Sequence, residues 1–205
     1  RATPVMFDGS EAGACAKAYG FAAPVKVAAS RENDLTGGFY RPMTVHRVQA
    51  GLDAAGEISG WDQVCVAKSI TKGTPFDGAP KDAPDKSMVE GADDTSQYRI
   101  KDFRLGQHLM ETQVPVLWWR SVGHTHTAFV KETVIDELLA MAGKDPVEGR
   151  LALLKHPRAA AVLRRAAAMA GFGKPAKKGR ALGVAARERF DRYVGRVAAG
   201  SVGRG

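Results

Sequence analysis

Residues 114–132, VPVLWWRSVGHTHTAFVKE, constrain the fold of this 205-residue chain more than any other segment. Two adjacent tryptophans, Trp118 and Trp119, lead into Arg120, and a turn of small residues over 121–123 precedes an apolar-periodic stretch. Bulky rings before the arginine and a glycine turn after it fix its position, and ligand sites depend on such fixed positions. The residues alone leave a second interpretation open, in which the tryptophans anchor the core and Arg120 is an ion-pair partner.

Hydrophobic periodicity predicts helices in both halves of the chain. Apolar residues at three-and-four spacing predict helices over 8–20 and 124–142. Asp145, followed by proline and then by glutamate at the third helical position, predicts the start of another helix. Pro157 interrupts that helix, and a further helix ends at Ala170 before a glycine.

Period-two alternation predicts a β-hairpin over 44–69 that turns at 53–56, where Gly56 suits a positive φ. Shorter β-rich runs predict further strands over 24–30, 98–113 and 181–202. These elements predict an α+β fold, in which antiparallel strands and a β-hairpin pack against a layer of helices.

The chain divides into three predicted units. Residues 1–113 hold a helix–strand unit, the hairpin and a long loop over 72–97, which is rich in Gly, Pro, Asp and Lys. Residues 114–173 hold the tryptophan–arginine turn followed by a helical layer. Residues 174–205 form a basic connector and the start of a further strand unit. Within the first unit, a charged loop is predicted over 31–34.

Composition excludes several classes of protein. Hydrophobic content of 44% with 25% charged residues is typical of a globular chain rather than a disordered one. No apolar run reaches the length that spans a membrane, and no signal-peptide pattern opens the sequence. The compartment stays open between cytoplasm and periplasm.

The sequence predicts no metal site. Two cysteines, Cys15 and Cys65, are too few for a disulfide framework, and both are interpreted as small buried hydrophobes. His124 and His126 have a spacing that can bind metal, but no third ligand is spaced nearby. His46 is interpreted as a packed, hydrogen-bonded strand residue.

The net charge of +8 raises the question of a nucleic-acid partner. No helix-turn-helix, zinc-finger or aromatic RNA-binding pattern accompanies the basic residues. We interpret them as a solvated surface, or as one that meets an acidic neighbour in a larger chain, and we predict no nucleic-acid partner. A basic nucleic-acid-binding protein is the alternative. Much of the excess positive charge lies toward the C-terminal end of the sequence, at Lys174, Lys177, Lys178, Arg180, Arg187, Arg189, Arg192 and Arg196.

The segment VPVLWWRSVGHTHTAFVKE resembles the cofactor-contact segment of the molybdopterin-binding large subunit of molybdenum hydroxylases, the family of xanthine dehydrogenases and aldehyde oxidoreductases. Within that family, the run WWRSVG is most similar to the isoquinoline 1-oxidoreductase beta subunits. The resemblance implies that Arg120, Ser121 and Gly123 contact the cofactor. It also implies that Val122 replaces an aromatic residue that lines the substrate pocket in xanthine-type enzymes.

Two further segments carry the resemblance. PVKVAASRENDLTGGFYRP is similar to a family segment in which the basic residue after Pro-Val orients substrate, and Lys26 occupies that place. The alternative for Lys26 is an ordinary exposed lysine, and a lysine cannot make the bidentate contacts of arginine. DPVEGRLALLKHPRAAAVLRRAA resembles helices of the same branch that serve as scaffold.

The resemblance implies an internal fragment of a molybdenum-dependent oxidoreductase that oxidises aldehydes or N-heterocyclic aromatics with water as oxygen source. It implies a molybdenum–molybdopterin cofactor, a small-molecule substrate, iron–sulfur clusters on a partner small subunit, and a cytochrome as a candidate electron acceptor. Both ends of the chain look cut. The family's Gly-Glu-Pro segment with the catalytic glutamate is absent, so no catalytic residue is assigned. The Gly-Gly-Gly-Phe-Gly-Arg cofactor loop is also absent, although Arg1 fits its last position. A non-catalytic structural or assembly fragment of that large chain is the alternative.

Overall fold

The computed structural model describes residues 5–20, 22–26, 28, 30–36, 38–74, 76–77, 84–92, 97–174, 178–189, 192–201 and 203. The elements in chain order are α1 (Val5–Tyr19), α2 (Arg31–Thr36), β1 (Thr44–Leu52), β2 (Ile58–Ala67), α3 (Lys86–Val89), β3 (Asp102–Leu109), α4 (His124–Met141), α5 (Pro146–Leu153), α6 (Pro157–Ala170), β4 (Arg180–Arg189) and β5 (Arg192–Ser201).

Strands β1 and β2 form the predicted antiparallel hairpin, paired from Thr44↔Ala67 to Leu52↔Ile58. The turn is closed by Asp53, whose Oδ1 accepts hydrogen bonds from the backbone N–H groups of Ala55 and Glu57, each at 2.9 Å. Gly56 has a φ of 72°, the left-handed conformation that glycine adopts without steric cost. The sequence prediction of this hairpin and its turn is confirmed.

Strand β3 joins the other edge of β2 in parallel, from Gly60↔Asp102 to Ala67↔Leu109. Parallel strands require a crossover that returns the chain to the starting end, and residues 68–101 provide it. The predicted α+β class is confirmed, with antiparallel pairs β1–β2 and β4–β5, and this parallel pair is added to it.

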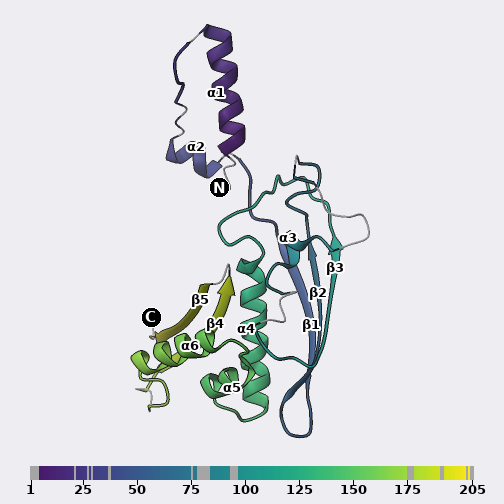
Figure 1. The fold of residues 1–205 in the computed structure, drawn as a ribbon, viewed down its shortest axis with the longest axis vertical. Helices are drawn as coiled ribbons and strands as arrows, with labels where there is room; N and C mark the ends of the chain where they lie inside the picture. The colour runs from purple at the N-terminus through teal and green to yellow at the C-terminus, as the bar shows by residue number, and fades with distance from the viewer. Residues whose placement is uncertain are drawn as a thin grey trace.

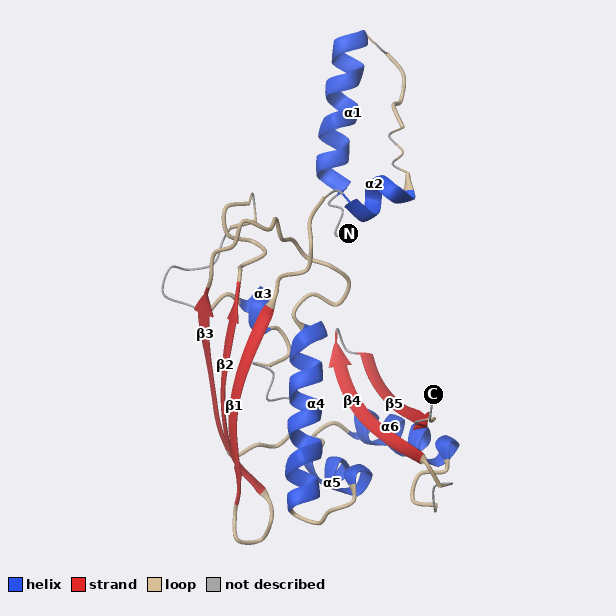
Figure 2. Ribbon diagram, turned by 180° about the vertical axis from the view of Figure 1, so that it is seen from behind, coloured by secondary structure: helices blue, strands red, loops and turns tan. Residues whose placement is uncertain are grey.

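Helix α4 lies between the three-stranded sheet and the β4–β5 pair (Figures 1 and 2). Its predicted apolar stripe is confirmed, because Ile135, Leu138 and Leu139 are buried. The core extends from this stripe to both sheets and to the neighbouring helices. Its buried members are Ile58, Trp61, Tyr98, Ile135, Leu138, Leu139, Val147, Leu153, Leu154, Ala159, Leu163, Ala167, Val184 and Ala186.

Helix α5 begins, and helix α6 ends at Ala170, as the sequence predicts. Asp145 caps α5 by accepting hydrogen bonds from the N–H groups of Val147 and Glu148. Helix α6 packs against β5, where a Cβ on Gly195 would lie 3.1 Å from the Leu163 Cα. That distance is too short for most side chains, so glycine permits the close approach of strand and helix.

The N-terminal region differs from its prediction. The described residues within 24–30 form no strand, and the predicted loop over 31–34 opens α2. Helices α1 and α2 extend away from the rest of the molecule (Figures 1 and 2). Without a neighbouring layer to pack against, the alanine-rich helix leaves Cys15 exposed, so the prediction that Cys15 is buried is wrong.

The predicted loop over 72–97 contains a buried turn of helix, α3, capped by Asp85. Met88 and Val89 are buried against Cys65 and Ala67 of β2, because this part of the crossover returns over the sheet. The prediction of an unstructured loop is therefore wrong for α3. Residues 78–83 and 93–96 lie outside the described part. Among the described helices, none combines the length and apolarity needed to span a membrane.

Candidate functional site

The structure brings together the two sequence segments on either side of the predicted site. The Tyr40 N–H donates to the Pro115 carbonyl at 2.9 Å, and the Leu117 N–H donates to the Tyr40 carbonyl at 3.1 Å. This parallel bridge between Tyr40 and Val116 places the end of GGFYRP beside the start of LWWRSVG. The turn at 120–123 then leads directly into α4.

The turn has a strained backbone. Ser121 has a φ of 72° and Val122 a φ of 42°, and both are non-glycine residues in the left-handed region. This conformation is a genuine outlier for a β-branched side chain, and such outliers concentrate at functional sites. The Val122 N–H donates to the Trp119 carbonyl at 2.8 Å, which closes the turn.

Val122→Gly is expected to raise the free energy of unfolding by about 0.5–2 kcal/mol. Removing the β-branched residue relieves about 1–3 kcal/mol of strain, and the added freedom of the unfolded chain offsets about 0.5–1 kcal/mol. Urea denaturation measures the change. Val45→Gly, at an exposed strand position, is the matched control and should destabilise. Equal destabilisation by both changes would show that Val122 carries no strain.

Arg41 holds the turn from outside. Its Nη2 donates to the Arg120 carbonyl at 3.1 Å, and its Nη1 donates to Thr125 Oγ1 at 2.7 Å and to the Val122 carbonyl at 3.4 Å. The guanidinium carbon lies 6.0 Å from the centre of the Trp119 ring. Sequence reasoning did not assign Arg41 to the site, although the signal was present in the aromatic–arginine–proline run of FYRP.

The crossover also packs against the turn. A Cβ on Gly123 would lie 2.8 Å from the Ser87 carbonyl oxygen and 2.9 Å from the Glu90 Cβ. Gly123 has an ordinary φ of −63°, so space rather than backbone conformation requires glycine there. Thr127 strengthens this contact, because its hydroxyl donates to the Glu90 carbonyl at 2.7 Å.

The tryptophans are not the main anchors of the turn. Trp118 and Trp119 are half-buried and Arg120 is exposed, whereas Leu117 is only 2% exposed. Trp118 makes an edge-to-face contact with Phe76, with the two ring centres 4.9 Å apart. Leu117 therefore carries the packing role that the sequence assigned to the tryptophans, because it faces inward beside the bridge to Tyr40.

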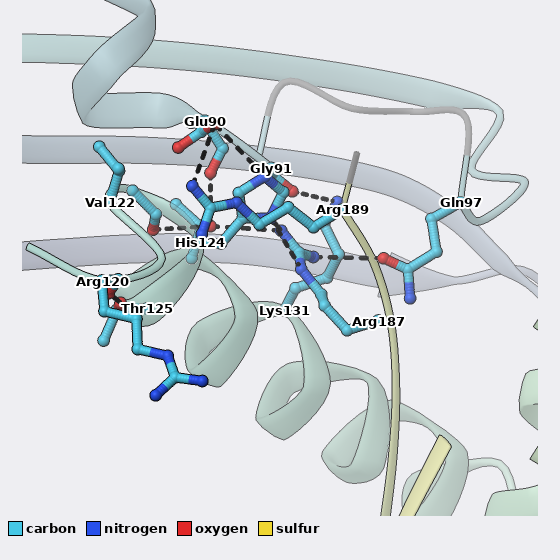
Figure 3. A network of polar contacts seen from close by, with 12 residues as sticks. Glu90, Gly91, Gln97, Arg120, Val122, His124, Thr125, Lys131, Arg187 and Arg189 are labelled. Atoms are coloured by element: carbon cyan, nitrogen blue, oxygen red, sulfur yellow. Dashed lines mark hydrogen bonds and ion pairs between the residues drawn. The ribbon is translucent and has the colours of Figure 1, made fainter. Parts of the chain in front are cut away.

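A polar network connects the first turn of α4 to β4 and to the crossover (Figure 3). Arg187 donates to His124 Nδ1 from Nη2 at 2.8 Å and from Nε at 3.2 Å, and its Nη1 donates to Gln97 Oε1 at 3.2 Å. A guanidinium only donates, so His124 carries its proton on Nε2, 3.7 Å from Glu90 Oε1. The network fixes the orientation of the helix that follows the turn.

His126 meets two residues of the hairpin. His46 and Cys65 are directly opposite on β1 and β2, so their side chains share one face of the sheet. His46 Nε2 lies 2.8 Å from His126 Nδ1 and 3.7 Å from Cys65 Sγ. No third ligand is spaced near His124 and His126 in the sequence, and the fold instead brings His126 to His46, 80 positions away in the chain.

Burial sets the protonation of these three groups. Burial, with smaller contributions from His46 and Arg41, lowers the pKa of His126 to about 4. Burial also lowers the pKa of His46 and raises the pKa of Cys65 to about 11. The cluster is therefore uncharged near pH 7, with two neutral imidazoles and a thiol.

Lys26 lies apart from the turn. It is exposed, in the connection between α1 and α2, and those helices extend away from the body that carries Val122 (Figures 1 and 2). The structure places Arg120, Ser121, Val122 and Gly123 in one turn but does not bring Lys26 to it. The substrate role of Lys26 stays a prediction.

Two solved structures share this fold. Aldehyde oxidoreductase from Desulfovibrio gigas matches with a TM-score of 0.52 and 18% identity, covering 71% of this chain and 18% of that one. Quinoline 2-oxidoreductase from Pseudomonas putida 86 matches with a TM-score of 0.54 and 17% identity, covering 84% and 25%. The fold of this chain therefore also occurs as part of these two larger oxidoreductase chains.

The chain belongs to the molybdopterin cofactor-binding domain family, whose model matches residues 9–153. It is 31% identical over 146 residues to a nicotinate dehydrogenase subunit of Pseudomonas putida, covering 66% of this chain and 12% of that protein. It is 29% identical over 143 residues to membrane-bound aldehyde dehydrogenase [pyrroloquinoline-quinone] of Gluconacetobacter polyoxogenes, covering 64% and 18%. The chain thus spans less than a fifth of the length of these two relatives. The family predicted from the sequence is confirmed.

Proposed function

We propose that the turn at 120–123 contacts molybdopterin in a complete oxidoreductase subunit, and that this subunit oxidises aldehydes or N-heterocyclic aromatics with water as oxygen source. The strained Ser121–Val122 backbone, contacted by both Arg41 and the crossover, is the observation that carries the proposal. Strain persists only where the surroundings impose it, and here Arg41 and the crossover around Glu90 do so.

The residues present fit an anionic cofactor. Molybdopterin carries a phosphate and a dithiolene, and both are attracted to hydrogen-bond donors and positive charge. Helix α4 has 18 residues and follows the turn directly, so its positive end lies at the turn, and no side chain among the described residues caps it. Arg41 lies against the turn, and the exposed Arg120 forms part of it. The charge and the donors at the turn therefore suit the group that the family binds.

Each residue has a proposed role. The backbone of Arg120, Ser121 and Gly123 holds the cofactor, Val122 lines the substrate pocket, and Lys26 orients substrate if α1 and α2 meet another part of the complete subunit. When bound, the cofactor supplies the oxidising centre for hydroxylation. The names of the curated relatives mention a nicotinate and an aldehyde, which agrees with the proposed substrate classes.

The electron path is also proposed. An iron–sulfur small subunit receives the electrons, with a cytochrome as a further acceptor. The name of the Pseudomonas putida relative identifies it as one subunit of a dehydrogenase, which supports an assembly of several chains. The placement of this chain in the isoquinoline 1-oxidoreductase branch remains part of the proposal.

Arg41→Lys in the complete subunit is expected to reduce bound molybdenum and pterin severalfold. An ammonium group cannot reproduce the planar fork that bonds the Arg120 carbonyl and Thr125 together. Molybdenum per polypeptide and the fluorescence of the oxidised, released pterin measure the loss. Arg47→Lys, on an exposed position of β1, is the matched control and should leave both unchanged.

The alternative is a structural fragment that holds the fold without contacting cofactor. It predicts that Arg41→Lys and Arg47→Lys retain the same molybdenum while Arg41→Lys lowers only the unfolding midpoint. That pair of results would contradict the proposed function.

A further inference from the structure

We propose that His46, Cys65 and His126 form a binding site for a zinc-type divalent ion, separate from the molybdopterin contact. The three side chains come from three elements, β1, β2 and the first turn of α4. Their ligand atoms all lie within 4.8 Å of one another. This site rests on its own geometry and does not depend on the proposed oxidoreductase function.

The spacing is close to that of a tetrahedral zinc site. Zinc binds imidazole nitrogen at about 2.0–2.1 Å and thiolate sulfur at about 2.3 Å, so neighbouring ligand atoms lie about 3.3–3.7 Å apart. Cys65 Sγ already lies 3.7 Å from His46 Nε2. His46 Nε2 and His126 Nδ1, now 2.8 Å apart, would separate by about 0.5 Å. The Cys65 and His126 ligand atoms lie within 4.8 Å of each other.

The elements hold the ligands in place before an ion binds. His46 and Cys65 are opposite each other in the antiparallel pairing of β1 and β2, so strand register fixes their separation. His126 lies in the first turn of α4, whose orientation is set by the contacts of His124 and Thr127. A site on paired strands and a packed helix is more precise than one on loops.

The ligand types select the ion. Two imidazoles and one thiol suit zinc and related borderline ions, whereas magnesium and calcium require oxygen ligands. Among the described residues, the thiol has two long polar contacts, 3.7 Å to His46 and 3.9 Å to the Met88 carbonyl, and neither is a strong hydrogen bond. Three protein ligands leave a fourth position for water or another ligand. A small hollow lies beside His126, lined also by Met88, Trp119 and Val122 but not by His46 or Cys65.

Gln63 determines which ring nitrogen of His46 carries the proton. The Trp61 indole N–H donates to Gln63 Oε1 at 3.0 Å, and an indole nitrogen can only donate. The Gln63 amide nitrogen therefore faces His46 Nδ1 at 3.1 Å, which leaves the His46 proton on Nε2. That proton is donated to His126 Nδ1 when no ion is bound.

Ion binding has a defined proton balance. The ion takes the place of the proton on His46 Nε2, and the ring then carries its proton on Nδ1. The Gln63 side chain has to shift so that Oε1 accepts from His46 Nδ1 as well as from Trp61 Nε1, since an amide oxygen can accept two hydrogen bonds. The Cys65 thiol releases its proton to solvent as the sulfur–metal bond forms, so one proton is released for each ion. Gln63→Glu should tighten binding about 10-fold, because a carboxylate accepts from both Trp61 and His46 Nδ1 and favours the ligand tautomer.

The test uses the full 205-residue chain with Zn²⁺ in titration calorimetry and Co²⁺ as a spectroscopic probe. We expect one ion per chain, one proton released, and a thiolate-to-cobalt charge-transfer band. Cys65→Ser should abolish that band, and Cys65→Ser and His126→Gln should each weaken Zn²⁺ binding at least about 100-fold, more than a typical outer-shell change. Cys15→Ser, at the exposed cysteine, is the matched control.

Circular dichroism of each variant checks that it folds, and Gln63→Glu provides a test in which binding strengthens. Mg²⁺ should not bind at the site. Zn²⁺ affinity unchanged by both Cys65→Ser and His126→Gln would overturn the proposal, as would the absence of a thiolate band in the parent. Zinc binding that fails while molybdenum is retained in the complete subunit would refute this site alone and leave the proposed function intact.

Discussion

Glu132→Gln is expected to lower the free energy of unfolding by about 1–3 kcal/mol, because it leaves buried donors unsatisfied and removes one of the two carboxylates that pair with the buried Arg150. The other carboxylate, Asp136 Oδ1, stays 2.6 Å from Arg150 Nη1. Glu132 Oε2 accepts from Arg150 Nε and from the Ala186 N–H, each at 3.0 Å. Its Oε1 accepts from the Tyr98 hydroxyl at 2.8 Å. Arg150 is 0% exposed, so water cannot replace the lost partner. Urea denaturation followed by circular dichroism measures the change.

The amide of glutamine cannot satisfy all three donors. Burial and the Glu132 charge raise the pKa of Tyr98, so its hydroxyl stays a donor. If the glutamine NH₂ group faces Tyr98, two donors oppose each other; if it faces Arg150 and the Ala186 N–H, the same conflict arises there. Glu137→Gln, at an exposed position on the same helix, is the matched control and should change stability by less than about 0.5 kcal/mol. Similar effects of the two changes would show that the buried network contributes little.

Gly123→Val in the complete subunit is expected to remove most of the molybdenum, while Arg120→Lys reduces it only modestly. The valine side chain would collide with the Ser87 carbonyl oxygen and with the backbone and Cβ of Glu90, so the turn must move. The Arg120 side chain is exposed, and its backbone carbonyl rather than its guanidinium is held by Arg41. Molybdenum per polypeptide is the measurement.

Gly60→Val is the matched control for added bulk, because a Cβ at Gly60 meets no heavy atom within 4 Å. It should retain molybdenum at the parent level. If Gly123→Val retains metal and Arg120→Lys loses it, then the turn geometry is not the cofactor contact and Arg120 acts through its guanidinium.

Local patterns in the sequence predict the local elements correctly. Alternation finds the β1–β2 hairpin, and the apolar stripe finds α4, because both signals depend on residues that are neighbours in one element. The cap at Asp145 is visible for the same reason. The segments of the turn are also recognisable from their residues, since Arg120 and Gly123 lie in one continuous run.

Long-range packing is not visible in these patterns. No periodicity in the sequence indicates that β3 pairs in parallel with β2, or that Arg41 reaches a turn some 80 residues later. The meeting of His46, Cys65 and His126 depends on strand register and on the position of α4 together. The exposure of Cys15 likewise depends on what α1 packs against, which its own residues do not specify.

The parallel position of β3 also constrains the order of folding. The β1–β2 hairpin closes through a turn of a few residues, whereas Gly60 and Asp102 of the β2–β3 pair are 42 residues apart in the chain. Closing the longer loop costs more entropy, so we expect β3 to join after the hairpin has formed. Until then the open edge of β2, with its apolar side chains, can pair with another chain. Growth temperature and chaperone supply should therefore decide how much of the protein reaches its native state.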